Sequence, residues 1–90
     1  MRLDRFLKLA RIIKRRSLAR QMIDIGAVRV NAAVAKASKE VKEGDIIEIA
    51  FPGKLLSVKV LPYTEPNLKR GAIAYEIIEE RTVTGERRPW

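Results

Sequence analysis

The stretch RRSLARQMIDIGAVRVN, residues 15–31, changes from a helical to a strand pattern of apolar residues at a single glycine. Before Gly26 the apolar residues recur every three or four positions, as on one face of a helix. They are Leu18, Ala19, Met22, Ile23 and Ile25. After Gly26, Val28 and Val30 alternate with polar residues, which is typical of a strand. The stretch predicts a helix that is capped by Ser17 and ended by Gly26, followed directly by a short strand.

A first helix is predicted upstream, in LDRFLKLA at residues 3–10. Its apolar face is made of Leu3, Phe6, Leu7 and Ala10. Asp4 falls near the helix start, where the helix dipole favours an anion. Ile12 and Ile13, in the basic segment between the two helices, are expected to reach the core. Helices this short are unstable alone in water, so both must pack their apolar faces on strands.

Downstream, IIEIAF (46–51) and KLLSVKVL (54–61) flank Pro52-Gly53 and predict a hairpin. Turns are expected at Asn31-Ala32-Ala33 and at KEGD (42–45). Residues 62–71 predict a loop with two prolines. These patterns indicate an α+β fold, with two short N-terminal helices packed on a small, mostly antiparallel sheet.

The C-terminal residues are less clearly patterned. AIAYEIIEER, residues 72–81, fits a strand or a short helix, and the alternation of Ile73, Tyr75 and Ile77 favours a strand. TVTGERRPW, residues 82–90, is expected to be a frayed tail.

Charge is concentrated at the N-terminus. The chain of 90 residues has a net charge of +8, and residues 1–20 hold eight basic residues against Asp4 alone. Such a concentration repels itself unless something neutralises it, which favours a polyanionic partner over a merely solvated basic face. The two helices are too short and too committed to a core for a membrane surface, and DNA would require a helix free to enter the major groove.

Composition argues against an enzyme. The chain contains no cysteine and no histidine, which removes disulfides, thiolate or imidazole metal ligands and the commonest general base. No carboxylate pair suggests acid–base chemistry, and KEGD does not match the spacing of a calcium loop. No apolar run reaches the roughly 18 residues of a membrane span. We expect a cytoplasmic, non-catalytic and monomeric protein without metal or cofactor.

Several motifs in order resemble the RNA-binding domain of ribosomal small-subunit protein four. They are RLDRFL (2–7), RRSLARQMIDIGAVRVN (15–31) and KASKEVKEGDIIEI (36–49). The length, RLDRFLKLARIIKRR (2–16), AKAS (35–38) and YEIIEE (75–80) are most similar to the stand-alone RqcP family. The resemblance implies an RNA-binding domain over 1–62 and a C-terminal extension over 63–90, with a strand near 73–79 and a flexible tail. Ala32 departs from the family, which usually has glycine there.

The same resemblance implies a function in ribosome-associated quality control. RqcP proteins bind the obstructed large ribosomal subunit through rRNA and peptidyl-tRNA, and support RqcH-dependent alanine tailing of stalled chains. The alternative is a factor like the fifteen-kilodalton heat-shock protein, which binds dissociated large subunits that carry nascent chains and recycles them.

Two arginines are the leading RNA-binding candidates. Arg2 precedes the first helix and Arg16 precedes Ser17, so packing of the helices would bring both arginines together as a seat for phosphate. The resemblance favours the same two residues. The competing interpretation is that Arg16 bonds a carboxylate such as Asp4.

Other candidates extend this patch. Those near it are Arg5, Lys8, Arg11, Lys14 and Arg15, with Arg20 and Lys36 beside them and Lys39 at its border. For each, a solvated surface position is the alternative, and for Arg20 also an ion pair with Asp24. Asn31 is expected to hold a turn rather than touch RNA. Tyr63, Tyr75 and Trp90 are candidates for base stacking, although packing or a tail contact fits their positions better.

Overall fold

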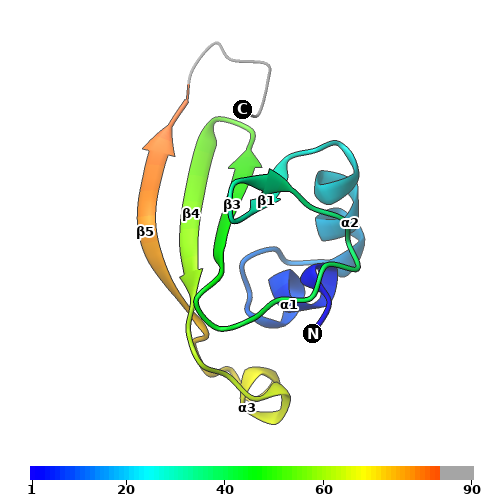
Figure 1. Cartoon of the computed structure of the whole chain (residues 1–90), viewed down its shortest axis with the longest axis vertical. Coiled ribbons are helices and arrows are strands. Elements are labelled where there is room, and N and C mark those ends of the chain that lie inside the picture. The colour runs from blue at the N-terminus through cyan, green and yellow to red at the C-terminus, as the bar shows by residue number, and fades with distance from the viewer. Residues whose placement is uncertain (84–90) are drawn as a thin grey trace.

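The computed structural model describes residues 1–83, and the α+β fold expected from the sequence is confirmed. Its helices are α1 (Leu3–Leu9), α2 (Arg16–Asp24) and α3 (Glu65–Lys69). Its strands are β1 (Val28–Val30), β2 (Ala33–Val34), β3 (Ile46–Phe51), β4 (Lys54–Val60) and β5 (Tyr75–Thr82). In Figure 1, α1 and α2 lie together beside β1 and β3, and α3 lies at the far end of the sheet from the β3–β4 turn.

The strands form one antiparallel sheet in the order β2-β1-β3-β4-β5. β3 and β4 make the predicted hairpin, with Phe51 opposite Lys54 across the turn. Gly53 has a φ of +78°, a left-handed conformation that glycine adopts without strain. β1 pairs with β3, so the chain leaving α2 enters the middle of the sheet and holds the helices against it.

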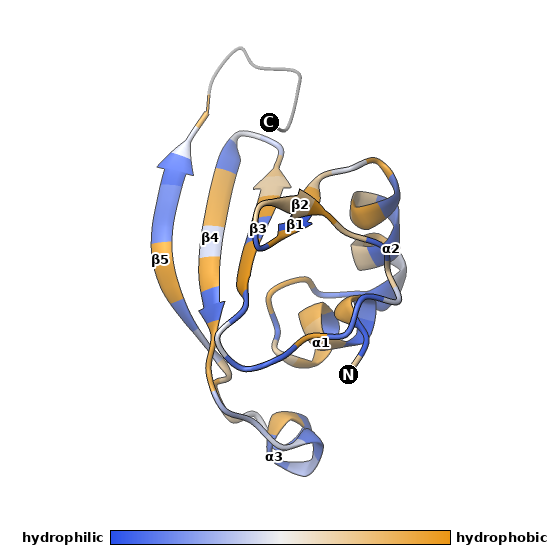
Figure 2. Ribbon diagram, in the orientation of Figure 1, coloured by the Kyte–Doolittle hydropathy of each residue, from blue (hydrophilic) through white to orange (hydrophobic). Residues whose placement is uncertain are grey.

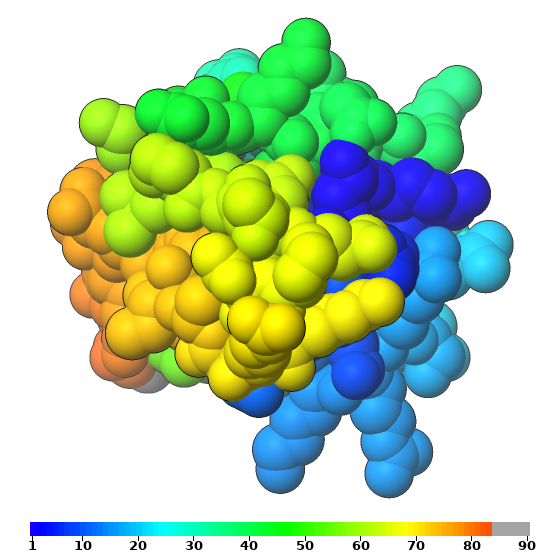
Figure 3. Space-filling view, turned by 90° about the horizontal axis from the view of Figure 1, so that it is seen from below, coloured from blue at the N-terminus to red at the C-terminus, as the bar shows by residue number. Residues whose placement is uncertain are grey.

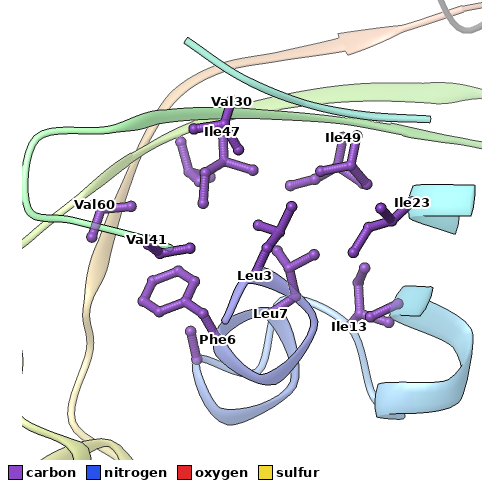
Figure 4. Close-up of a cluster of buried hydrophobic side chains, with 14 of the residues drawn as sticks. Leu3, Phe6, Leu7, Ile13, Ile23, Val30, Val41, Ile47, Ile49 and Val60 are labelled. Atoms are coloured by element: carbon purple, nitrogen blue, oxygen red, sulfur yellow. The ribbon is translucent and has the colours of Figure 1, made fainter. Parts of the chain in front are cut away.

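The core lies between the two N-terminal helices and the sheet. Leu3, Phe6 and Leu7 of α1 are fully buried, and in Figure 4 they point towards Ile47 and Ile49 of β3. Figure 2 shows apolar residues running along the middle of β4, where alternate residues are buried. The helical face predicted for residues 3–10 is therefore confirmed, because each of its four apolar residues belongs to this core.

α2 differs from its predicted form at the start. The helix begins at Arg16, with Arg15 as the extended residue before it and no side-chain cap, so the cap predicted at Ser17 is wrong. The helix packs against its neighbours by one face only: Ala19, Met22 and Ile23 are buried, whereas Leu18 is 43% exposed and Ile25 is 74% exposed. The buried stripe is therefore narrower than the sequence suggested.

Gly26 ends this helical segment as predicted, with a φ of +79°. The expected turn after β1 is also present, and both Asn31 (φ +52°) and Ala32 (φ +69°) adopt left-handed conformations there. Asn31 holds the turn: its Oδ1 accepts a hydrogen bond from the Ile46 N–H at 3.0 Å, and its Nδ2 donates to Asp45 at 3.1 Å. The structural role expected for Asn31 is therefore the one observed.

α3 is absent from the sequence-based expectation, which placed a loop at 62–71. Thr64 caps this short helix, because its hydroxyl oxygen accepts a hydrogen bond from the Asn67 N–H at 3.3 Å. Pro66 in the first turn lacks an N–H that would have no helical partner there. Leu68 is 1% exposed and anchors the helix to the rest of the molecule.

The strand favoured near 73–79 is present as β5, which runs from Tyr75 to Thr82. A β-bulge lies between Ser57 and Val58, at the centre of its pairing with β4. Thr82, expected to begin the tail, is the last residue of β5. Residues 84–90, including Trp90, lie outside the described part of the chain.

Candidate RNA-binding surface

Three arginines converge on one buried carboxylate at the starts of α1 and α2. The Nε atoms of Arg2 and Arg16 donate to Asp4 at 3.2 and 3.1 Å. Arg20 Nε lies 3.9 Å from Asp4 Oδ2. We call these four residues, Arg2, Asp4, Arg16 and Arg20, the Asp4 cluster. The predicted meeting of Arg2 and Arg16 is observed, and so is the competing Arg16–Asp4 bond; Arg20 faces Asp4 instead of pairing with Asp24.

The backbone fixes the start of α1 beneath this cluster. The N–H groups of Leu3 and Asp4 donate to the carbonyls of Lys39 and Ala37 at 2.8 and 3.3 Å. The Met1 ammonium forms an ion pair with Glu40. The segment that leads into β3 therefore holds the first turn of α1, and α1 in turn packs on α2.

Burial separates the acid from the bases. The Asp4 side chain is fully buried, whereas those of Arg2, Arg16 and Arg20 are 48%, 46% and 60% exposed. Because each guanidinium approaches Asp4 chiefly through Nε, much of its outer edge faces solvent. The cluster therefore presents three cations outward over one inward anion, a net charge of +2.

Asp4 keeps its negative charge in this position. Burial by itself raises the pKa of the Asp4 carboxyl, but hydrogen bonds from Arg16 and Arg2, the charge of Arg16 and the Arg5 N–H together outweigh it, so the pKa lies below its usual value. An ionised Asp4 can order the three guanidinium groups without cancelling their charge. The ion pair is thus compatible with an RNA-binding role for Arg2 and Arg16, which remains a prediction.

Arg5 points to another element. It forms an ion pair with Glu65 of α3, and Lys69 lies 3.9 Å from the same glutamate. Its side chain is 34% exposed. Arg5 therefore connects α1 to α3, a contact that the sequence could not indicate without α3.

The remaining candidates fall on two sides of the helices. Lys8, Arg11 and Lys14 line a groove of about 450 Å³ beside α3, together with Lys69, which sequence reasoning missed. Lys36 and Lys39 line a second, smaller hollow of about 280 Å³ beside β2. The predicted patch is therefore divided: the structure brings Arg2, Arg16 and Arg20 together and places the other cations around them.

Two aromatic candidates pack within the molecule. The Tyr63 ring lies 5.3 Å from that of Phe6, and its hydroxyl donates to the Val41 carbonyl at 3.0 Å. Burial, with the charges of Glu40 and Asp45, raises the pKa of Tyr63. Tyr75 packs partly buried against the core. Packing, the preferred interpretation, is therefore what the structure shows for both.

Within residues 1–83, no group of three or more acidic side chains is arranged to hold a metal ion. In the same range, no helix has the length and apolar character needed to cross a bilayer.

Comparison with known proteins shows the family. The S4 domain model matches residues 1–47. The RQC P-site tRNA stabilizing factor of Streptococcus pneumoniae is 48% identical over 84 residues, covering 92% of this chain and 96% of the relative. That of Bacillus subtilis is 43% identical over 81 residues, covering 89% and 94%. The chain belongs to the RqcP family of S4-domain proteins.

RqcP membership confirms the resemblance seen in the sequence motifs. A solved structure of heat shock protein 15 from Vibrio cholerae, whose title describes a trimer, has a TM-score of 0.72 with this RqcP-family chain at 30% identity. The match covers 86% of this chain and 80% of the other. The S4 match at residues 1–47 contains the whole Asp4 cluster and ends before α3.

Proposed function

We propose that this chain is a non-catalytic RNA-binding factor of ribosome-associated quality control, acting on peptidyl-tRNA in the obstructed large ribosomal subunit. The names of its relatives support the setting, since they are called P-site tRNA stabilizing factors. The Asp4 cluster is the observation in the structure that supports the contact. Work alongside RqcH during alanine tailing, in the cytoplasm, is part of the same proposal.

The Asp4 cluster suits phosphate groups of folded RNA. Guanidinium groups match phosphate oxygens with paired donors, and a fixed group loses less freedom on binding than a free side chain does. Asp4 provides this order by accepting hydrogen bonds from two of the arginines. Structured RNA is recognised largely through its shape and backbone, for which fixed cations are sufficient.

The second candidate function is that of a heat-shock-protein-15-like factor for dissociated large subunits. Two observations favour it: the Vibrio cholerae fold match and a Haemophilus influenzae heat shock protein 15 homolog that is 32% identical over 82 residues. Both functions use RNA contacts on the large subunit, so they differ in what the subunit carries.

Sedimentation with purified large subunits tests the proposal. The wild-type chain should migrate with subunits that carry peptidyl-tRNA and bind empty subunits less well. Equal binding to both would favour the second function. Arg2→Ala/Arg16→Ala should be released from the subunits, whereas Lys42→Ala/Lys59→Ala, a matched loss of two exposed cations, should remain bound. If the arginine variant binds as wild type does, the Asp4 cluster is not the contact.

A further inference from the structure

A cationic groove lies between the end of α1 and the start of the C-terminal extension. Its volume is about 450 Å³. Four cations line it, namely Lys8, Arg11, Lys14 and Lys69, and apolar side chains including Leu9 and Leu68 lie between them. None of its lining residues is acidic.

The α3 wall of this groove is attached at several points. Arg5 of α1 pairs with Glu65, and Leu68 is buried in the main core. Beyond α3, Gly71 (φ +96°) lies so close to Arg11 that an added Cβ would be 2.8 Å from its Nη1. Figure 3, seen from below, shows α3 in yellow directly beside the blue N-terminal residues, with side chains of the segment after α1 extending away from the body.

We propose that this groove binds an unpaired nucleotide of an RNA strand, with its phosphate among the four cations and its base or ribose over Leu9 and Leu68. Cations attract the phosphate, and the apolar side chains cover one face of the base. The groove is open along its length, which suits a nucleotide within a continuing strand. This inference rests on the proposed function and adds a second RNA contact to it.

The groove requires both parts of the chain. Lys8, Arg11 and Lys14 lie within the S4 match at residues 1–47, whereas Leu68 and Lys69 lie beyond it. An S4 domain that ends at residue 47 would have no second wall. We therefore assign to α3 the role of completing an RNA site, in addition to its packing on α1.

Local cleavage of RNA tests this directly. Because the chain has no cysteine, a single introduced cysteine can carry an iron chelate that produces hydroxyl radicals. The three variants are Lys69→Cys in the groove, Ser17→Cys beside the Asp4 cluster and Lys59→Cys on exposed β4. Each is bound to large subunits that carry peptidyl-tRNA, and the cleaved nucleotides are mapped by primer extension.

Strong cleavage from positions 69 and 17, well above that from 59, supports the groove. Cleavage from 17 with only background from 69 overturns the groove and leaves the proposed function standing. Background cleavage from all three positions overturns both. Cleavage from 69 alone supports the groove and moves the principal RNA contact away from the Asp4 cluster.

A charge-matched pair of variants gives a second test. Lys14→Gln/Lys69→Gln and Lys42→Gln/Lys59→Gln each lower the net charge from +8 to +6. The groove variant should lose about tenfold in affinity for these subunits, and the control much less. Equal losses in the two variants would show that only overall charge matters and would overturn the groove.

Discussion

At the start of the chain, the Asp4 cluster places one buried acid beneath three half-exposed arginines, whereas β5 at the other end carries its charges without such support. Glu76, Glu79 and Glu80 of β5 are exposed, as are its isoleucines, with Ile77 53% and Ile78 52% exposed. A buried counter-charge turns mobile cations into a fixed surface, while acids on an open strand repel RNA and discourage pairing with another chain. The molecule therefore has a basic face and an acidic edge, which together would orient it on RNA.

Removal of the buried acid should have the largest effect on this comparison. Asp4→Ala leaves three arginines close together without their shared acceptor, and we expect a loss of about 2–3 kcal/mol in the free energy of unfolding. Urea denaturation measures it. Asp24→Ala, an exposed acid on the neighbouring helix, serves as the control and should change stability by less than about 0.5 kcal/mol. A loss no larger than that of the control would show that the cluster is not organised by Asp4.

Acid should remove the same contribution. Since the pKa of Asp4 is lower in the folded chain than in the unfolded one, its stabilisation is complete above the unfolded pKa of about 3.9 and is lost as pH falls through the folded value. Stability curves of the wild type and Asp4→Asn should therefore converge below about pH 4. A constant difference between them down to pH 2 would contradict the ionised state assigned to Asp4.

Much of the fold could be predicted because its signals are local. Gly26 at the change of period and the alternation in β3 and β4 each depend on a few neighbouring residues. α3 was missed because five residues carry too little periodicity, and its cap at Thr64 stands in a proline-containing segment that also reads as a loop. The Ser17 cap failed because the extended residue fell at Arg15 instead.

The candidate site was predictable only in part. Its cations were visible as a charge excess, and the adjacency of Arg2 and Arg16 followed from the packing of two apolar faces. The burial of Asp4 depends on how α1 sits on residues 37–40, which no spacing within α1 reveals. The groove depends on Lys69, which has meaning only once α3 has been placed against α1.

A smaller effect is expected at the junction between the two regions. Gly71→Ala places a side chain at a φ of +96° and displaces the end of Arg11, at a cost of about 1–2 kcal/mol in the free energy of unfolding. Thermal or urea unfolding measures the loss. Gly44→Ala has a similar φ of +89° but open space around its Cβ, so it isolates the backbone contribution. Normal stability of Gly71→Ala would mean that the chain around α3 is not held as described.

The smallest effect is expected on the acidic edge. Ile78→Thr replaces a half-exposed residue on β5 and should change the free energy of unfolding by no more than about 0.5 kcal/mol, with ribosome binding intact. Denaturation and sedimentation measure the two quantities. Loss of subunit binding at normal stability would place a functional contact on β5, contrary to the division of roles described above.

The salt dependence of binding to large subunits tests the role of the Asp4 cluster most directly. Each phosphate contact adds about 0.7–0.9 to the slope of log affinity against log salt concentration. Arg2→Ala/Arg16→Ala should therefore reduce the magnitude of that slope by about 2, while Lys42→Ala/Lys59→Ala leaves it nearly unchanged. An arginine variant with the wild-type slope would contradict the account, because its two guanidinium groups would then contact no phosphate.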